Sequence, residues 1–170
     1  MKKTLFTLML MIASSLAINA QSLTGKEWRA MIPSTDGTKV ALELTFENNG
    51  TCEAEVVAME DINEDGMSMT ISVEVEIPGT YTLNGKNLNI NLNKDKATID
   101  FDFDFKNVDA QTKAMLKNMM KAELDKSKNE AKNEILDDMP PMDNMKIVSL
   151  DSSKLVIADS TGEEMTFYAK

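Results

Sequence analysis

The chain has 170 residues, a formal net charge of −10, no histidine and a single cysteine. This acidity excludes nucleic acids and anionic membrane surfaces as preferred partners, because like charges repel. The lack of histidine excludes Ser-His-Asp catalysis, Cys-His catalysis and histidine-containing zinc sites, and one cysteine allows neither an internal disulfide nor a multi-cysteine metal site.

The first twenty residues have the pattern of a secretory signal peptide. Two lysines form a basic start, an apolar stretch runs from Leu5 to Ile18, and Ala20 offers a small residue for cleavage. The apolar stretch is too short to span a bilayer. We therefore expect residues 1–20 to be cleaved near Ala20. Residues 21–170 would then form one domain that is exported to the periplasm or secreted.

Several runs after this segment alternate apolar and polar residues, which predicts strands with one buried and one solvated face. The first covers residues 40–46 and the second 51–60, and Asn-Asn-Gly at 48–50 predicts a hairpin between them. One face of the second strand carries only small or medium side chains: Cys52, Ala54, Val56 and Ala58. Such a face suits close packing or a tight bend.

The longest alternating pattern lies between residues 67 and 105. It divides into four runs with tight turns or a kink between them: 67–77, 80–83, 87–93 and 97–105. Short turns between neighbouring runs predict a meander in which each strand pairs with the one before it. Three aspartates alternate with phenylalanines in the last run, so we expect them on a solvated outer wall and not in a catalytic cleft: Asp100, Asp102 and Asp104.

A different pattern covers residues 110–136, which are mostly Ala, Lys, Glu, Leu and Met and include neither Gly nor Pro. This composition predicts a long helix with Asp109 as its N-cap. Its apolar residues form one stripe: Leu116, Met120, Leu124, Ala131 and Ile135. Such a helix would reach about 40 Å, so we expect a break near Ser127 or a half that overhangs the sheet. Three shorter strands follow at the end of the chain.

Short antiparallel strands separated by turns predict a mainly β fold. A barrel is favoured over a sandwich, because a meander closes without long crossovers and leaves no exposed edge. We therefore expect an antiparallel up-and-down barrel of about 8–10 strands. The helical insertion, at residues 109–136, would precede the last three strands.

Four segments resemble the lipocalin-like (calycin-type) domains of small exported proteins from Bacteroides-type bacteria. They are Leu-x-Gly-x-x-Trp at 23–28, Leu-x-Phe-x-x-x-Gly-Thr at 44–51, Gly-Thr-Tyr-x-Leu-x-Gly-x-x-Leu at 79–88 and Ser-Lys-Leu-Val-Ile-x-Asp-x-x-Gly-Glu-x-x-x-Phe at 153–167. Two residues separate Gly25 from Trp28, where the lipocalin signature has one. The resemblance implies a barrel with an apolar-ligand or structural binding role, and it implies no specific ligand.

The apolar faces of the strands predict where a ligand would sit. The expected lining combines strand residues with two methionines of the helix: Leu44, Phe46, Met69, Ile71, Val73, Leu88, Ile90, Phe101, Phe103, Met115 and Met119. The helix methionines would cover the barrel mouth as a lid or pack as part of the core. This set offers no polar anchor, so the barrel is either filled by its own side chains or binds a lipid-like molecule.

Residues 61–66 match the first half of a calcium-binding loop, with oxygen ligands at alternate positions and a glycine at the turn. The ligands would be Asp61, Asn63 and Asp65. A serine, Ser72, stands where such a loop needs a bidentate glutamate, so a solvated acidic loop without Ca²⁺ is the favoured interpretation. No basic residue neighbours Cys52 in the sequence, which favours a buried structural thiol over a reactive one.

The leading hypothesis is a non-enzymatic, exported lipocalin-like barrel that binds a small apolar or lipid-like ligand and spans no membrane. The alternative is a cell-envelope module with a filled core, whose acidic strand faces or helix contact a protein partner. We do not expect an enzyme. Without histidine, an enzyme would depend on carboxylates, lysine, serine or tyrosine, and the predicted inner faces hold no polar constellation.

Overall fold

The computed structural model describes residues 23–33, 38–64 and 67–170, so the predicted signal peptide lies outside the described residues. This part of the chain holds the following elements: β1 (Glu27–Ile32), β2 (Lys39–Phe46), β3 (Thr51–Glu64), β4 (Met67–Asn84), β5 (Asn87–Leu92), the 3₁₀-helix η1 (Lys94–Lys96), β6 (Thr98–Lys106), α3 (Ala110–Asp138), β7 (Met145–Leu150), β8 (Lys154–Ala158) and β9 (Glu164–Ala169). The predicted mainly β fold, with a long helix before the last three strands, is confirmed.

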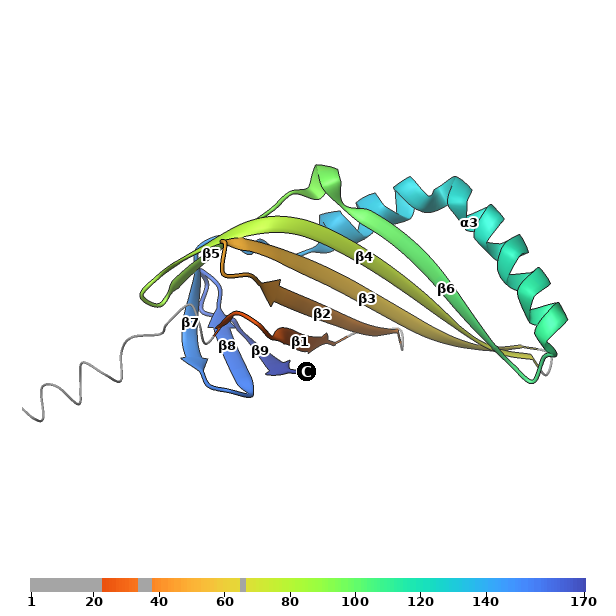
Figure 1. Ribbon diagram of the computed structural model, residues 1–170, viewed down its shortest axis with the longest axis horizontal. Helices are drawn as coiled ribbons and strands as arrows, with labels where there is room; N and C mark the ends of the chain where they lie inside the picture. Colours follow the sequence, from red (N-terminus) through yellow and green to blue (C-terminus); the bar gives the residue numbers. More distant parts are fainter. Residues whose placement is uncertain (1–22, 34–37, 65–66) are drawn as a thin grey trace, which may run out of the picture.

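Eight of these strands close into an antiparallel barrel (Figure 1). Around the barrel their order is β3, β2, β1, β9, β8, β7, β5 and β4, and the pairing of β3 with β4 completes the ring. The predicted antiparallel barrel is therefore confirmed. The ninth strand, β6, pairs with Ser68–Glu76 of β4, and the outer part of this pairing extends past the ring.

The topology departs from a simple meander at β4. This strand is 18 residues long and continuous, so the two runs predicted at 67–77 and 80–83 are one strand. One edge of β4 pairs with β3, while the other edge pairs with β6 over its first half and with β5 over its second half. The six residues of β5 cannot cover the whole edge, and β6 therefore returns to β4 instead of pairing with β5.

Pro78 and Gly79 lie where β4 changes partner. The N–H of Asn93 donates to the carbonyl of Pro78 at 2.8 Å. The N–H and C=O of a residue in an antiparallel strand point to the same side, so the N–H that Pro78 lacks falls at the gap between β5 and β6. Gly79 is required by crowding, because a Cβ there would lie 2.7 Å from the carbonyl oxygen of Asn91.

The half of the barrel around Trp28 is a packed core. Trp28 is fully buried, and its indole N–H donates to the carbonyl of Leu23 at 2.8 Å. Phe46 packs edge to face against Tyr81, with ring centroids 5.0 Å apart. Further fully buried residues come from strands all around the ring: Leu44, Ile77, Leu88, Ile147, Leu155, Ile157 and Phe167. This half of the barrel interior is filled by side chains of the protein itself.

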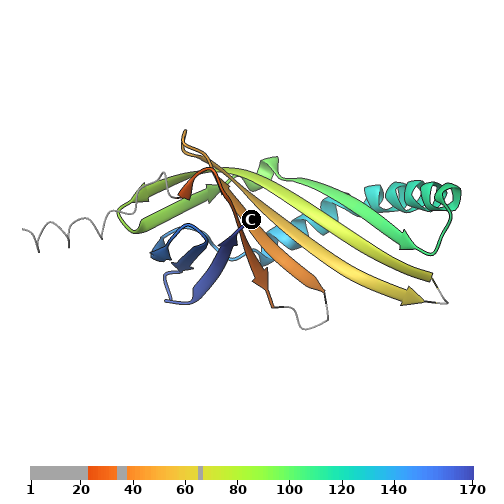
Figure 2. The same ribbon diagram turned by 60° about the horizontal axis from the view of Figure 1, so that its bottom comes forward.

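The helix α3 runs beside β6 from the far end of the extended sheet back to the barrel (Figures 1 and 2). Asp109 is the N-cap, as predicted, because its carboxylate accepts the N–H groups of Gln111 and Thr112, both at 3.0 Å. The predicted apolar stripe is confirmed as the side that packs on the core. Of the two predicted alternatives, the break near Ser127 is absent, and the N-terminal half of the continuous helix instead projects past the barrel (Figure 1). The Ser127 hydroxyl donates to the Leu124 carbonyl at 3.3 Å, a contact that bends a helix without breaking it.

Three ion pairs join the N-terminal half of α3 to β6: Lys113–Asp104 at 2.5 Å, Lys117–Asp102 at 2.8 Å and Lys121–Asp100 at 3.2 Å. We call these pairs the lysine–aspartate ladder. The lysines recur about every 6 Å along the helix and the aspartates about every 6.6 Å along the strand, so the two repeats stay in step. The aspartates lie on the outer wall, as predicted, and they also anchor the helix. Hydrogen bonds from the lysines lower the pKa of each aspartate.

A double-mutant cycle with Asp102→Asn and Lys117→Met tests this ladder. We expect a coupling of about 0.2–1 kcal/mol in the free energy of unfolding at neutral pH, because the pair is largely exposed. The pKa of Asp102 is lowered in the folded state, so its contribution is complete above the ordinary value of 3.8 and is lost as the pH falls through the lower folded value. Urea denaturation measures the coupling. A coupling that persists after Asp102 is protonated would contradict the ladder.

Candidate functional site

The end of the barrel opposite Trp28 holds an apolar cavity of about 370 Å³. It lies between the inner faces of β1, β2 and β3 and the C-terminal end of α3. The residues that line it are mostly aliphatic: Ile32, Pro33, Val40, Leu42, Val56, Ala58, Ile135, Asp138, Met139 and Pro140. Ligand pockets measure about 300–1,000 Å³, so this cavity is large enough for a small molecule.

Strand register explains why these residues meet. Ile32, Val40 and Ala58 stand opposite one another across β1, β2 and β3, and directly paired residues share a face of the sheet. Val56 and Ala58 belong to the face of small side chains that the sequence shows, and they leave room above β3. Ile135 and Met139 close the space from the helix side. The small-residue face was therefore the one signal in the sequence that could have located the cavity.

The eleven residues predicted to line a ligand site lie elsewhere, and none of them lines this cavity. Four are buried in the packed core: Leu44, Phe46, Leu88 and Ile90. Five lie on the paired strands β4 and β6, where the phenylalanines are buried and the others half-buried: Met69, Ile71, Val73, Phe101 and Phe103. Ile71 and Val73 face the two phenylalanines of this set, while Met69 faces Phe105. Met115 and Met119 project from α3 with 63% and 62% of their surface exposed. The nine predicted strand residues do lie on the inward-facing side of the sheet, which is the side that also carries the cavity residues of β1, β2 and β3.

A second hollow, of about 550 Å³, adjoins the cavity. Ile32, Pro33 and Pro140 line both spaces. The second hollow adds four methionines and three acidic residues: Met31, Met142, Met145, Met165, Asp159, Glu163 and Glu164. An apolar space therefore opens towards an acidic rim.

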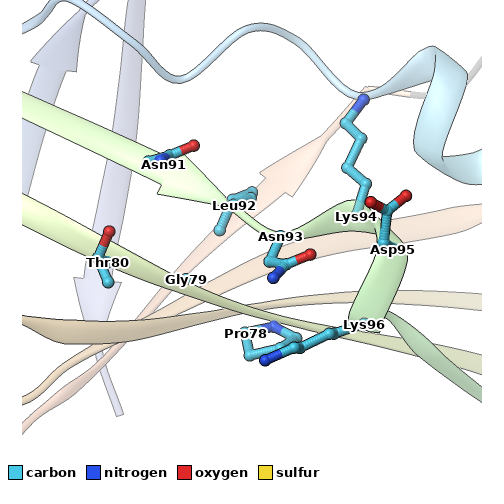
Figure 3. Close-up of a pocket in the computed structure, with 9 residues that line it drawn as sticks. All are labelled: Pro78, Gly79, Thr80, Asn91, Leu92, Asn93, Lys94, Asp95 and Lys96. Atoms are coloured by element: carbon cyan, nitrogen blue, oxygen red, sulfur yellow. The ribbon is translucent and has the colours of Figure 1, made fainter.

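A polar cleft of about 590 Å³ lies where β4 changes partner, and Figure 3 shows its nine lining residues. Lys94 points from η1 towards the helix, where its ammonium donates to the carbonyl of Leu136. This contact places a cation at the negative end of the helix dipole. Lys96 lies on the other side, beside Pro78. The two lysines thus diverge, and the cleft presents no converging set of polar groups.

Two of the three residues expected to bind calcium lie on a strand and not in a loop. β3 continues to Glu64, so Asp61 and Asn63 are strand residues that pair with Thr70 and Ser68 of β4, and the prediction of a loop from residue 61 was wrong. The Asp61 carboxylate accepts the Thr70 hydroxyl at 2.7 Å and pairs with Lys39 at 3.1 Å, which together lower its pKa. Asp65 lies outside the described residues. Within the described ranges, no three His, Cys, Asp or Glu side chains gather as a metal site requires.

Glu43 on β2 is a buried charge that the sequence did not single out. It is 4% exposed, and it pairs with Arg29 at 3.3 Å and with Lys170 at 2.6 Å. Burial raises the pKa of Glu43, while Lys170 acts in the opposite direction. Lys170 also pairs with Glu27. This cluster faces away from Leu42 and Leu44, on the outside of the barrel, where it ties the end of the chain to β1 and β2.

No protein-family model matches this chain, and no curated protein matches it. Across the described residues, no helix combines the length and the apolar character that a membrane span requires.

The thiol of Cys52 should be unreactive in the folded protein. Burial raises the pKa of Cys52 to about 11, and the nearby Glu53 charge acts in the same direction. A pKa near that value leaves at least about a hundredfold less thiolate at neutral pH than an ordinary cysteine has. We expect labelling by a disulfide reagent to be at least that much slower than in denaturant, where one thiol per chain should react. Equal rates in the two states would show a reactive cysteine.

Proposed function

We propose that this protein is a non-enzymatic, exported lipocalin-like barrel that binds a small apolar molecule at the end of the barrel opposite Trp28. The observation that carries the proposal is the cavity of about 370 Å³ between β1–β3 and the end of α3. Nine of its ten lining residues are apolar, and Asp138 is the tenth. Such a site binds mainly by removing apolar surface from water, at about 25 cal/mol per Å².

The contacts around the cavity support a site that exists before the ligand arrives. Lys94 holds the end of α3 through the Leu136 carbonyl, and Lys132 donates to the carbonyl of Ala97 at 3.3 Å. These contacts attach the roof of the cavity to η1 and to the residue before β6. A cavity held open in this way lowers the entropy lost on binding. The signal-peptide pattern supports binding outside the cytoplasm, and the resemblance to lipocalin-like domains supports the same class of function.

An Ala58→Phe substitution tests the proposal, because the added ring would occupy the cavity above β3. We expect the affinity for a neutral apolar dye such as N-phenyl-1-naphthylamine to fall by at least about tenfold. Fluorescence titration measures the affinity, and circular dichroism checks that the barrel is retained. Thr82→Phe is the matched control, since Thr82 is exposed on β4 and adds the same ring outside the cavity. Unchanged dye binding by a folded Ala58→Phe variant would contradict the proposal.

A cell-envelope interaction module is the second candidate function. Two observations favour it: half of the barrel is filled by its own side chains, and Met115 and Met119 are exposed on the half of α3 that projects past the barrel. Exposed apolar side chains on a projecting element are typical of protein contacts. A Met115→Glu/Met119→Glu variant should then lose a partner from the envelope fraction of its own source and keep dye binding. Retention of the same partner by this variant would exclude the helix methionines as the contact.

A further inference from the structure

The charges around the apolar cavity are of one sign. Asp138 is the one charged residue in the cavity lining, and the adjoining hollow adds Asp159, Glu163 and Glu164. The chain has 18 lysines and arginines, yet none is among the described residues that line either space. Lys86 and Lys146 line a further hollow together with Asp159 and Glu164, on the side away from the cavity. Asp138 and Glu163 line no such space with a lysine or arginine, so a ligand in the cavity lies next to a mainly negative rim.

Three of these four carboxylates also have no ion-pair partner among the described residues. Asp159 accepts the N–H groups of Thr161 and Glu163, at 2.8 and 2.9 Å, and so stabilises its own turn. No described residue forms an ion pair or a side-chain hydrogen bond with Asp138, Glu163 or Glu164. The aspartates of β6 differ, since each has its own lysine. The carboxylates of Asp138, Glu163 and Glu164 can therefore interact with a positively charged group of a ligand.

The helix adds to the same field. Asp138 is the last residue of α3, and the C-terminal end of a helix carries a partial negative charge from its free carbonyl groups. A carboxylate at this end lies where a cation would normally be favoured. Lys94 already binds the Leu136 carbonyl at this end of the helix, so a cationic group beside Asp138 would act mainly on the Asp138 carboxylate.

We propose that the ligand of this cavity is an amine with an apolar body, a cationic amphiphile and not a fatty acid; this inference rests on the proposed function. The apolar body fills the space between Ala58 and Met139, and the ammonium lies at the rim near Asp138 and the adjoining glutamates. A fatty acid of the same length would bring a fourth charge of the same sign to three unpaired carboxylates, and electrostatic repulsion would weaken its binding.

Three probes with the same chain test the inference: dodecylamine, dodecanol and dodecanoate, each below its micelle-forming concentration. Displacement of the neutral dye from the full folded chain measures each affinity. We expect the amine to bind about twofold to fivefold more tightly than the alcohol, because the rim carboxylates are exposed, and the carboxylate to bind most weakly. Asp138→Asn/Glu164→Gln should lower the ratio of amine to alcohol affinity, because two of the three carboxylates that would face the ammonium lose their charge. The single variants D138N and E164Q should each lower the ratio in part.

A matched control separates a local effect from the attraction of any amine to an acidic protein. Glu53→Gln/Glu74→Gln removes the same charge from exposed positions on β3 and β4 outside the cavity lining, and it should keep the full ratio. An equal loss of the ratio in this control would overturn the inference. Equal affinity for the three probes, or tightest binding of dodecanoate, would also overturn it while the apolar site stands. Failure of the dye and of every probe to bind would overturn the proposed function as well.

Discussion

The pairing of β3 with β4 is the constraint on which the rest of the structure depends. Fourteen consecutive residue pairs, from Thr51–Thr80 to Glu64–Met67, close the barrel and carry both strands past it. Because β4 is so much longer than β5, its other edge needs a second partner, and β6 supplies it. The change of partner places Pro78 where no N–H is required. The edge of β6 that does not pair with β4 remains free of other described strands, and α3 docks beside it. The long β3–β4 pairing thus accounts for barrel closure, strand order and helix docking.

The docking of α3 determines where the cavity forms. The apolar stripe of the helix packs on the core, while the lysine–aspartate ladder aligns the helix with β6. The helix therefore runs back to the barrel and ends over the inner faces of β1–β3, where Ile135 and Met139 meet Val56 and Ala58. Small side chains on β3 and the end of the helix together create a space that neither element has by itself.

The acidity of the chain has two structural uses. On β6 the aspartates are paired with lysines and stabilise the contact with the helix. At the rim of the cavity, Asp138, Glu163 and Glu164 have no such partners among the described residues, so their charge is available to a ligand. Net charge alone does not distinguish these uses, because the difference depends on which side chains lie within about 4 Å of each carboxylate.

The features that rest on local interactions could be predicted from the amino-acid sequence. Alternation of apolar and polar residues predicted the strands, the Asp109 cap and the stripe from Leu116 to Ile135 predicted the helix, and together they indicated a barrel. Three features could not be predicted in this way: the return of β6 to β4, the contact of Glu43 with Lys170, and the position of the cavity above Ala58 and not beside Leu44. These outcomes depend on strand lengths, register and contacts between residues far apart in the chain. Alternation shows which side chains of a strand point into the barrel. It does not show where along the strand a cavity remains, because that depends on which other element packs over the strand.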